Sequence, residues 1–100
     1  MSLAVFDFEN HEVRFVGTPE APEWVAADVC SVLGIKNSRD ALARLDDYQK
    51  GSVVITDTSS STRNTITIST VKEAGLYALI FTSRKPIAKR FQRWVFEEVL

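Results

Sequence analysis

Apolar and polar residues alternate along two short segments near the start of the chain, Ala4–Phe8 and Glu12–Val16. A period of two is typical of β-strands, and the Asn10-His11 pair between the segments predicts a two-residue hairpin turn. The apolar positions of this predicted hairpin are Phe6, Phe8, Val13 and Phe15. The chain is therefore expected to open with a β-hairpin.

The next stretch predicts a short strand and a pair of short helices. Trp24-Val25 is the strand, and the first helix covers about Ala27–Leu33. Gly34 is expected to end this helix, because glycine takes the left-handed conformation of a C′ residue without steric cost. A second helix begins near Ser38, with Asn37 or Ser38 as its N-cap. The apolar positions of the second helix are Ala41, Leu42 and Leu45.

Two further strands are predicted over Ser52–Thr56 and Asn64–Ser69. The second strand alternates, so its isoleucines, Ile66 and Ile68, are expected to point inward and its hydroxyl side chains outward. The connection Asp57–Arg63 consists almost entirely of serine and threonine. The two strands are therefore expected to form a hairpin with a long, mobile polar tip.

The tract from Thr70 to Phe81 predicts the central helix of the core. Thr70 and Glu73 fit a capping box, in which the hydroxyl and the carboxylate each bind a backbone N–H group. The helix that follows is apolar on most sides, as is typical of a buried helix. Gly75 inside it costs about 1 kcal/mol relative to alanine, and we expect this glycine to allow close packing against another element.

The last predicted helix has two different sides. Ser83 is expected to cap this helix, and Pro86 is tolerated in its first turn. Its apolar side consists of Ile87, Ala88, Phe91, Trp94, Val95 and Val99. Its opposite side consists of Lys85, Lys89, Arg90 and Arg93. Phe96 and Leu100 fall among the basic residues. We expect both to be covered by something outside this chain segment, since adjacent exposed apolar groups often mark an interface.

Together these elements predict an α+β fold, in which small β-hairpins pack with about four helices and the first half contains a helix-turn-helix-like element. The 100 residues are expected to form a single domain over 1–100, because domains cluster near ~100–150 residues. With 45% hydrophobic and 25% charged residues, the composition is that of a globular protein rather than a disordered one.

The formal net charge of −1 conceals a separation of charge along the chain. Residues 1–28 contain six carboxylates and one arginine, whereas residues 84–93 contain five cations and no carboxylate. Such separation creates strong local potentials. The basic stretch favours an anionic partner, and the alternative is that the two halves neutralise each other within the fold.

No arrangement of residues indicates catalysis. His11 lies at a predicted turn, and Cys30 lies among apolar helix neighbours, so it is expected to be a small core residue. Asp46-Asp47 follows a helix and resembles an exposed loop start, and Ser59–Thr62 has hydroxyls but no nucleophile elbow. Glycine-rich phosphate loops are missing. We therefore expect no enzyme activity, no cofactor and, with one His and one Cys, no metal.

The sequence also predicts a small intracellular protein. The single cysteine excludes an internal disulfide framework and fits a reducing compartment. The chain opens without a secretory signal and has no apolar run near the ~20 residues that a membrane span needs. We therefore expect no membrane partner.

Two groups of residues are consistent with nucleic-acid binding. The helices around Gly34 have a helix-turn-helix cadence, in which the start of the second helix approaches base edges in the major groove. The residues expected there are Lys36, Asn37, Arg39 and Arg44. The residues expected to bind phosphates are Arg84, Lys85, Lys89, Arg90 and Arg93. For both groups, the alternative is the solvated polar side of an ordinary helix.

A set of short motifs covers nearly the whole chain. The motifs are Phe8–Arg14, Val25–Cys30, Val32–Gly34, Asp40–Leu42, Glu73–Phe81, Ser83–Pro86, Ala88–Phe91 and Trp94-Val95. This pattern resembles the Bro-N domain, the N-terminal domain of baculovirus Bro proteins and of many prophage antirepressors. One departure is Glu23-Trp24, where the family usually has Trp-Phe.

The resemblance implies an α+β DNA-binding domain of phages and large DNA viruses, followed by a variable C-terminal domain beyond Leu100. If a prophage encodes the chain, its location is the bacterial cytoplasm. The leading hypothesis is therefore the DNA-binding module of an antirepressor-like transcription regulator. The alternative is a module that captures a repressor or host protein through its acidic N-terminal segment, Phe96 and Leu100. A homodimer is compatible with both hypotheses.

Overall fold

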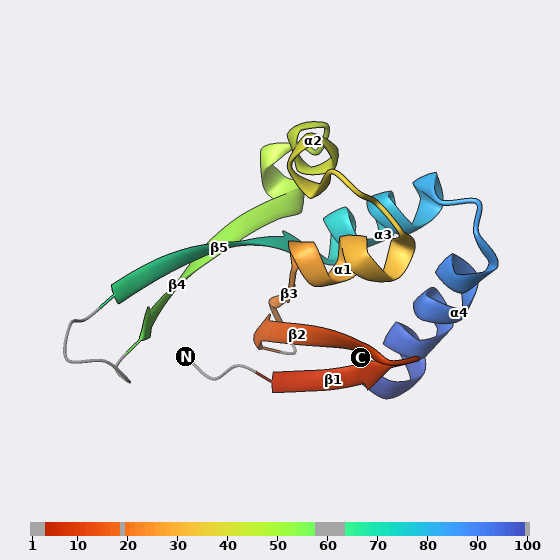
Figure 1. Cartoon of the computed structure of the whole chain (residues 1–100), viewed down its shortest axis with the longest axis horizontal. Coiled ribbons are helices and arrows are strands. Elements are labelled where there is room, and N and C mark those ends of the chain that lie inside the picture. The colour runs from red at the N-terminus through yellow and green to blue at the C-terminus, as the bar shows by residue number, and fades with distance from the viewer. Residues whose placement is uncertain (1–3, 19, 58–63, 100) are drawn as a thin grey trace.

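The computed structural model describes residues 4–18, 20–57 and 64–99, which form a five-stranded sheet and four α-helices (Figure 1). The strands are β1 (Ala4–Phe8), β2 (His11–Gly17), β3 (Pro22–Val25), β4 (Lys50–Asp57) and β5 (Asn64–Lys72). The helices are α1 (Ala26–Leu33), α2 (Ser38–Ala43), α3 (Glu73–Thr82) and α4 (Pro86–Trp94). A 3₁₀ turn, η1 (Asp47–Gln49), precedes β4, and α4 continues into a π-helical turn, η2 (Val95–Val99). The predicted α+β fold is confirmed.

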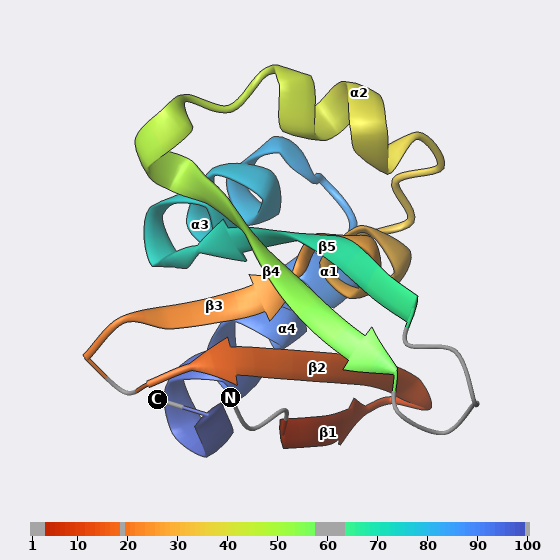
Figure 2. The ribbon, with the colours of Figure 1, turned by 90° about the vertical axis from the view of Figure 1, so that its left-hand side faces the viewer.

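The sheet joins the two halves of the chain. Its strand order is β1-β2-β3-β5-β4, and every neighbouring pair is antiparallel. Figure 2 shows the sheet in front of α1, α3 and α4, with α2 at one end of the molecule. Within the described residues, no helix is long and apolar enough to cross a membrane.

The hydrophobic core lies between the sheet and the helices α1, α3 and α4. Its largest fully buried side chains include Trp24 from β3, Leu33 from α1, Leu76 from α3 and Phe91 from α4. Cys30 is buried in this core, and burial raises the pKa of its thiol. The prediction that Cys30 is a small core residue is confirmed.

The predicted end of α1 and the predicted start of α2 are both confirmed. Gly34 follows α1 with a φ of 72°, in the left-handed region that glycine adopts without a steric penalty. Asn37 is the N-cap of α2, and its side-chain oxygen accepts a 3.0 Å hydrogen bond from the backbone N–H of Asp40. The start of α1 is tied to β2, because the guanidinium of Arg14 lies 2.8 Å from the carboxylate of Asp28.

The first hairpin turns one residue earlier than predicted. Phe8 pairs with His11, so the two turn residues are Glu9 and Asn10, with φ values of 47° and 69°. A two-residue turn that matches the twist of the strands needs positive φ at both positions. The asparagine therefore occupies the second turn position, and His11 begins β2.

The predicted capping box is wrong. Thr70 lies in β5, fully buried, and its hydroxyl donates a 2.5 Å hydrogen bond to the carboxylate of Glu23. The N-cap of α3 is Lys72, and no side chain caps that helix. The cause is the pairing of β5 with β3, which extends the strand to Lys72.

The predicted cap of the last helix is also shifted. Lys85 is the N-cap of α4, and Pro86 occupies the first turn as expected. Ser83 ends α3 instead, and its hydroxyl oxygen accepts a 3.3 Å hydrogen bond from the backbone N–H of Lys85. Since Pro has no N–H and a fixed φ, it starts the helix without any help from a side-chain cap.

The outer part of the second hairpin differs from the prediction. Ile66 was expected to point inward, but its side chain is 53% exposed. Only Ile68, nearer to the body of the domain, is half-buried. The predicted polar tip, residues 58–63, lies outside the described residues. The alternation identified a strand correctly, but it did not show that the strand leaves the core.

Gly75 packs as closely as predicted. A Cβ atom at this position would overlap the backbone carbonyl oxygen of Gln49. We expect Gly75→Ala to lower the free energy of unfolding by about 1–3 kcal/mol, because overpacking a backbone contact costs this much. By helix propensity alone, the alanine would instead raise the free energy of unfolding by ~1 kcal/mol.

Urea denaturation measures the Gly75→Ala effect. Ala74→Gly, at the exposed neighbouring position of α3, measures the propensity difference alone and is expected to cost ~1 kcal/mol. A Gly75→Ala variant more stable than the parent contradicts the close approach.

Candidate nucleic-acid interface

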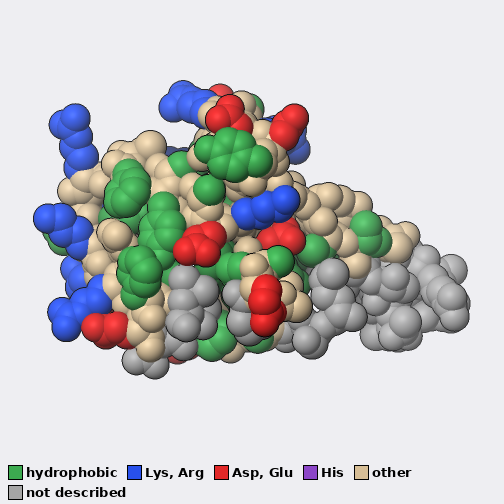
Figure 3. Space-filling model, turned by 180° about the vertical axis from the view of Figure 1, so that it is seen from behind, with side chains coloured by type: hydrophobic (Ala, Val, Ile, Leu, Met, Phe, Trp, Pro, Cys, Tyr) green, Lys and Arg blue, Asp and Glu red, His purple; other side chains and the backbone are tan. Residues whose placement is uncertain are grey.

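The basic side of α4 faces away from the core. Ala88, Phe91 and Val95 are buried, and these contacts fix the rotation of the helix. Lys89, Arg90 and Arg93 are consequently exposed. Figure 3 shows Lys and Arg side chains along the edge of the molecule where α4 lies. The two different sides predicted for this helix are present.

Two of the cations on α4 are paired with carboxylates. Arg90 lies 2.8 Å from Glu9 in the turn between β1 and β2, and this contact lowers the pKa of the Glu9 carboxyl. Arg93 lies 3.0 Å from Glu97, one turn further along. Among the described residues, Arg84, Lys85 and Lys89 form no ion pair. These three, which we call the free cations, are available to an anionic partner.

Lys85 connects α4 with the turn between α1 and α2. Its side chain passes over Gly34, where the terminal nitrogen would meet a Cβ atom. The C-terminal end of a helix carries a partial negative charge, which favours a lysine beside the end of α1. Because Lys36 follows Gly34 by two residues and is exposed, Lys85 lies beside the turn that carries Lys36.

The predicted residues of α2 do not form one surface. The side-chain oxygen of Asn37 caps the helix, and Arg44 lies 3.1 Å from Asp40 in an exposed pair. Arg44 also lines a cavity toward α3, whereas Arg39 lines a different cavity toward β5. The helices α2 and α4 lie on either side of α1 (Figures 1 and 2).

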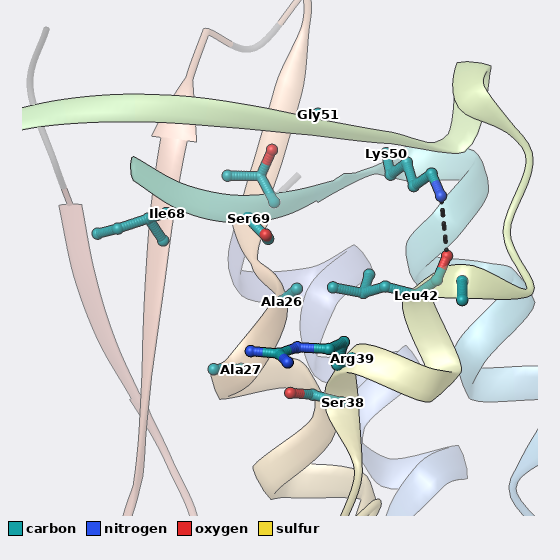
Figure 4. Close-up of a pocket in the computed structure, with 11 residues that line it drawn as sticks. Ala26, Ala27, Ser38, Arg39, Leu42, Lys50, Gly51, Ile68 and Ser69 are labelled. Carbon is teal, nitrogen blue, oxygen red and sulfur yellow. Dashed lines mark hydrogen bonds between the residues drawn. The ribbon is translucent and has the colours of Figure 1, made fainter. Parts of the chain in front are cut away.

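The cavity beside Arg39 contains a cation that sequence reasoning missed. It measures about 560 Å³ and lies between α2, the start of α1 and the base of β4 and β5. Lys50 lines it with Arg39, and none of the described residues that line it is acidic. Figure 4 shows the Arg39 side chain extending across it toward Ala27, while the ammonium of Lys50 donates a 3.1 Å hydrogen bond to the carbonyl of Leu42. No local motif marks Lys50, because only the tertiary fold places it near Arg39.

A row of three aromatic side chains lies next to the basic edge, exposed at Phe81 and Phe96 and half-buried at Tyr77. Phe96 is 55% exposed and stacks on Tyr77, with 5.5 Å between ring centroids. Tyr77 stacks in turn on Phe81, which is 71% exposed although it was expected in the core helix. Figure 3 shows hydrophobic side chains gathered on this side of the molecule. Leu100, predicted to accompany Phe96, lies outside the described residues.

Comparison with known proteins places the chain in a family. The model of the BRO family, N-terminal domain (Bro-N), matches residues 12–100. An uncharacterized protein of Haemophilus influenzae is 39% identical over 103 residues, which cover 100% of this chain and 49% of that protein. Protein 019R of Invertebrate iridescent virus 3, whose name records a Bro-N domain, is 30% identical over 99% of this chain and 29% of its own length.

The chain thus spans about half the length of the first of these relatives and less than a third of the second. No solved structure matches it. Because the family model covers most of the sequence, this chain belongs to the Bro-N family.

Proposed function

We propose that this domain binds duplex DNA, as the DNA-binding module of an antirepressor-like transcription regulator of a phage or virus. The observation that carries the proposal is the group of free cations, Arg84, Lys85 and Lys89, at one exposed edge of the domain. Membership of the Bro-N family supports it, because the family is associated with DNA-binding and antirepressor-like roles.

The two groups of candidate residues have different roles in this proposal. The free cations bind phosphates, which sets the affinity and the orientation of the domain but carries no sequence information. Arg90 and Arg93 contribute less, since each already faces a carboxylate. The start of α2, with Lys36, Asn37 and Arg39, supplies any preference among sequences. Arg44 has a smaller role because Asp40 neutralises it.

A titration of duplex DNA at two salt concentrations tests the proposal. Three phosphate contacts predict that log affinity falls with log salt with a slope of about −2.7, and five contacts predict about −4.5. A fourfold rise in salt then weakens binding by roughly 40-fold to 500-fold. Comparing random with genomic duplexes measures sequence preference. A folded protein that binds neither duplex at low salt contradicts the proposal.

Removing the partner of Arg90 is expected to strengthen DNA binding. Glu9→Gln leaves Arg90 without its ion pair, so one more cation is available to a phosphate. The salt slope should become steeper by about 0.9. Glu20→Gln removes the same charge from an exposed loop position next to β3 and serves as the control. Equal slopes for the two variants would show that Arg90 does not approach the DNA.

Capture of a repressor or host protein is the second candidate function. The aromatic row favours it, because the exposed rings of Phe81 and Phe96 stack on half-buried Tyr77 and exposed apolar groups close to each other are typical of protein interfaces. This candidate takes precedence if the DNA titration fails. The two functions are also compatible within one domain, since the aromatic row and the free cations are different residues.

A further inference from the structure

The outer half of the β4–β5 hairpin stands apart from the sheet. β3 pairs with β5 only over Thr70–Lys72, whereas β4 and β5 pair with each other along their whole described length. Residues 52–57 and 64–69 therefore form a two-stranded ribbon, which we call the arm. Figure 1 shows the arm extending beyond the rest of the fold, and the molecule measures 45 Å along its longest axis against 27 and 26 Å along the others.

Each face of the arm carries an uncovered apolar side chain, whereas Val53 nearer the base is buried. Val54 pairs with Thr67, and Ile66 pairs with Ile55 at the next position, so Val54 and Ile66 lie on opposite faces. Their side chains are 61% and 53% exposed. An isolated two-stranded ribbon is only marginally stable by itself. Apolar side chains that stay exposed on both faces of such a ribbon are typical of a surface that a binding partner covers.

The charge at the base of the arm favours a polyanion. Among the described residues, Arg39 and Lys50 line the cavity where the arm meets α2, and no lining residue is acidic (Figure 4). Within the arm, Asp57 at the outer end of β4 is acidic, and the residues from Ser52 to Thr56 and from Thr65 to Ser69 include no acidic side chain. Neutral hydrogen-bond donors and acceptors are offered by the exposed hydroxyls of Ser52, Thr65, Thr67 and Ser69. One carboxylate, that of Glu23, lies close to this base, where it accepts the hydrogen bond of Thr70.

The dimensions of the arm match one groove of DNA. Two paired strands lie ~4.8 Å apart, and six residues of strand span roughly 20 Å. The major groove of B-DNA is about 12 Å wide and admits a two-stranded ribbon, whereas the minor groove is only about 6 Å wide. Apolar side chains such as Val54 and Ile66 suit the methyl groups that thymine presents in the major groove.

We propose that the arm enters the major groove of duplex DNA and that Arg39 and Lys50 bind the phosphates at the edge of that groove. The proposal rests on the proposed DNA-binding function and names a different contact element from α4. It also changes the role of Arg39, from a reader of base edges to a phosphate contact at the base of the arm.

Matched charge substitutions on the two edge strands test the arm. Val54 in β4 and Val5 in β1 are exposed to a similar degree, 61% and 53%. Val54→Glu is expected to bind a random-sequence duplex about tenfold more weakly than Val54→Gln at ~0.1 M salt, because it places a carboxylate against the phosphates. Val5→Glu and Val5→Gln are expected to bind equally well. Thermal unfolding confirms that all four variants are folded.

A crosslinking measurement tests the same contact without a new charge. Cys30 is buried, so a cysteine introduced by Thr67→Cys is the accessible thiol for a photoreactive maleimide. Labelled Thr67→Cys should crosslink to the duplex, and labelled Val5→Cys should not. Methylation of guanine N7, which lies in the major groove, should reduce the crosslink, whereas methylation of adenine N3 in the minor groove should not.

The outcomes separate the two proposals. If the parent protein binds DNA, and Val54→Glu behaves as Val5→Glu does or Thr67→Cys fails to crosslink, the arm proposal is overturned while the proposed function stands. A crosslink that adenine methylation blocks, and guanine methylation does not, assigns the arm to the minor groove and also overturns it. If the parent protein binds no duplex at low salt, both proposals fall.

Discussion

Replacing Lys85 and Lys89 together by alanine is expected to weaken binding to duplex DNA about 60-fold at ~0.1 M salt. Each lysine that neutralises a phosphate contributes about 0.9 to the salt slope, so the slope should fall by about 1.8. The loss should be similar for all sequences, because phosphate contacts carry no sequence information. Fluorescence anisotropy at several salt concentrations measures both quantities.

A matched lysine elsewhere on the surface controls for the loss of charge. Lys72 is exposed, and it lines a shallow cavity together with Glu20, Glu23 and Glu73. Lys72→Ala should therefore affect binding much less than Lys89→Ala. Neither variant should change the melting temperature, since both side chains point to solvent. If the folded double variant has the DNA affinity and the salt slope of the parent, the basic edge is only a solvated surface. That result would favour the protein-capture function.

Phe91→Ala is expected to lower the free energy of unfolding by about 3–5 kcal/mol. The Phe91 ring is fully buried between Phe8 and Trp94, at centroid distances of 5.2 and 5.8 Å. Its removal leaves a cavity where α4 meets the first hairpin. Because a domain of this size is stable by only about 5–15 kcal/mol, a large part of the stability is lost.

Phe81→Ala is the control for Phe91→Ala in the same urea titration. It removes the same atoms from a side chain that is 71% exposed, so its cost should stay near ~0.5 kcal/mol. Equal costs for the two variants would contradict the arrangement of α4 against the sheet.

Local patterns predicted the elements of this fold well, because the forces that define those elements are local. The two-residue period gave both hairpins, and Gly34 and Asn37 marked the boundaries of α1 and α2. The capping box failed for a reason that lies far away in the sequence. Pairing with β3 holds Thr70 in a strand, and no local rule at Thr70 includes that pairing.

The candidate interface was less predictable than the fold. Helical phase placed Lys89 and Arg93 on the outer side of α4, but it could not show which cations are already neutralised. Arg90 meets Glu9 across 81 residues of sequence. Likewise, the alternation around Ile66 is the same whether the strand lies on a core or projects as an arm. Only tertiary structure distinguishes an available side chain from an occupied one.

The strand order has a consequence for how the chain folds. Glu23 and Thr70, whose side chains join β3 to β5, are 47 residues apart. Closing such a loop costs conformational entropy before the sheet contacts repay it, which slows folding. The two hairpins are local and can form early. The pairing of β3 with β5 can form only after the second half of the domain is present. During synthesis, β3 therefore presents an unpaired edge until β5 has left the ribosome, and this interval is when the domain is most exposed to misassociation.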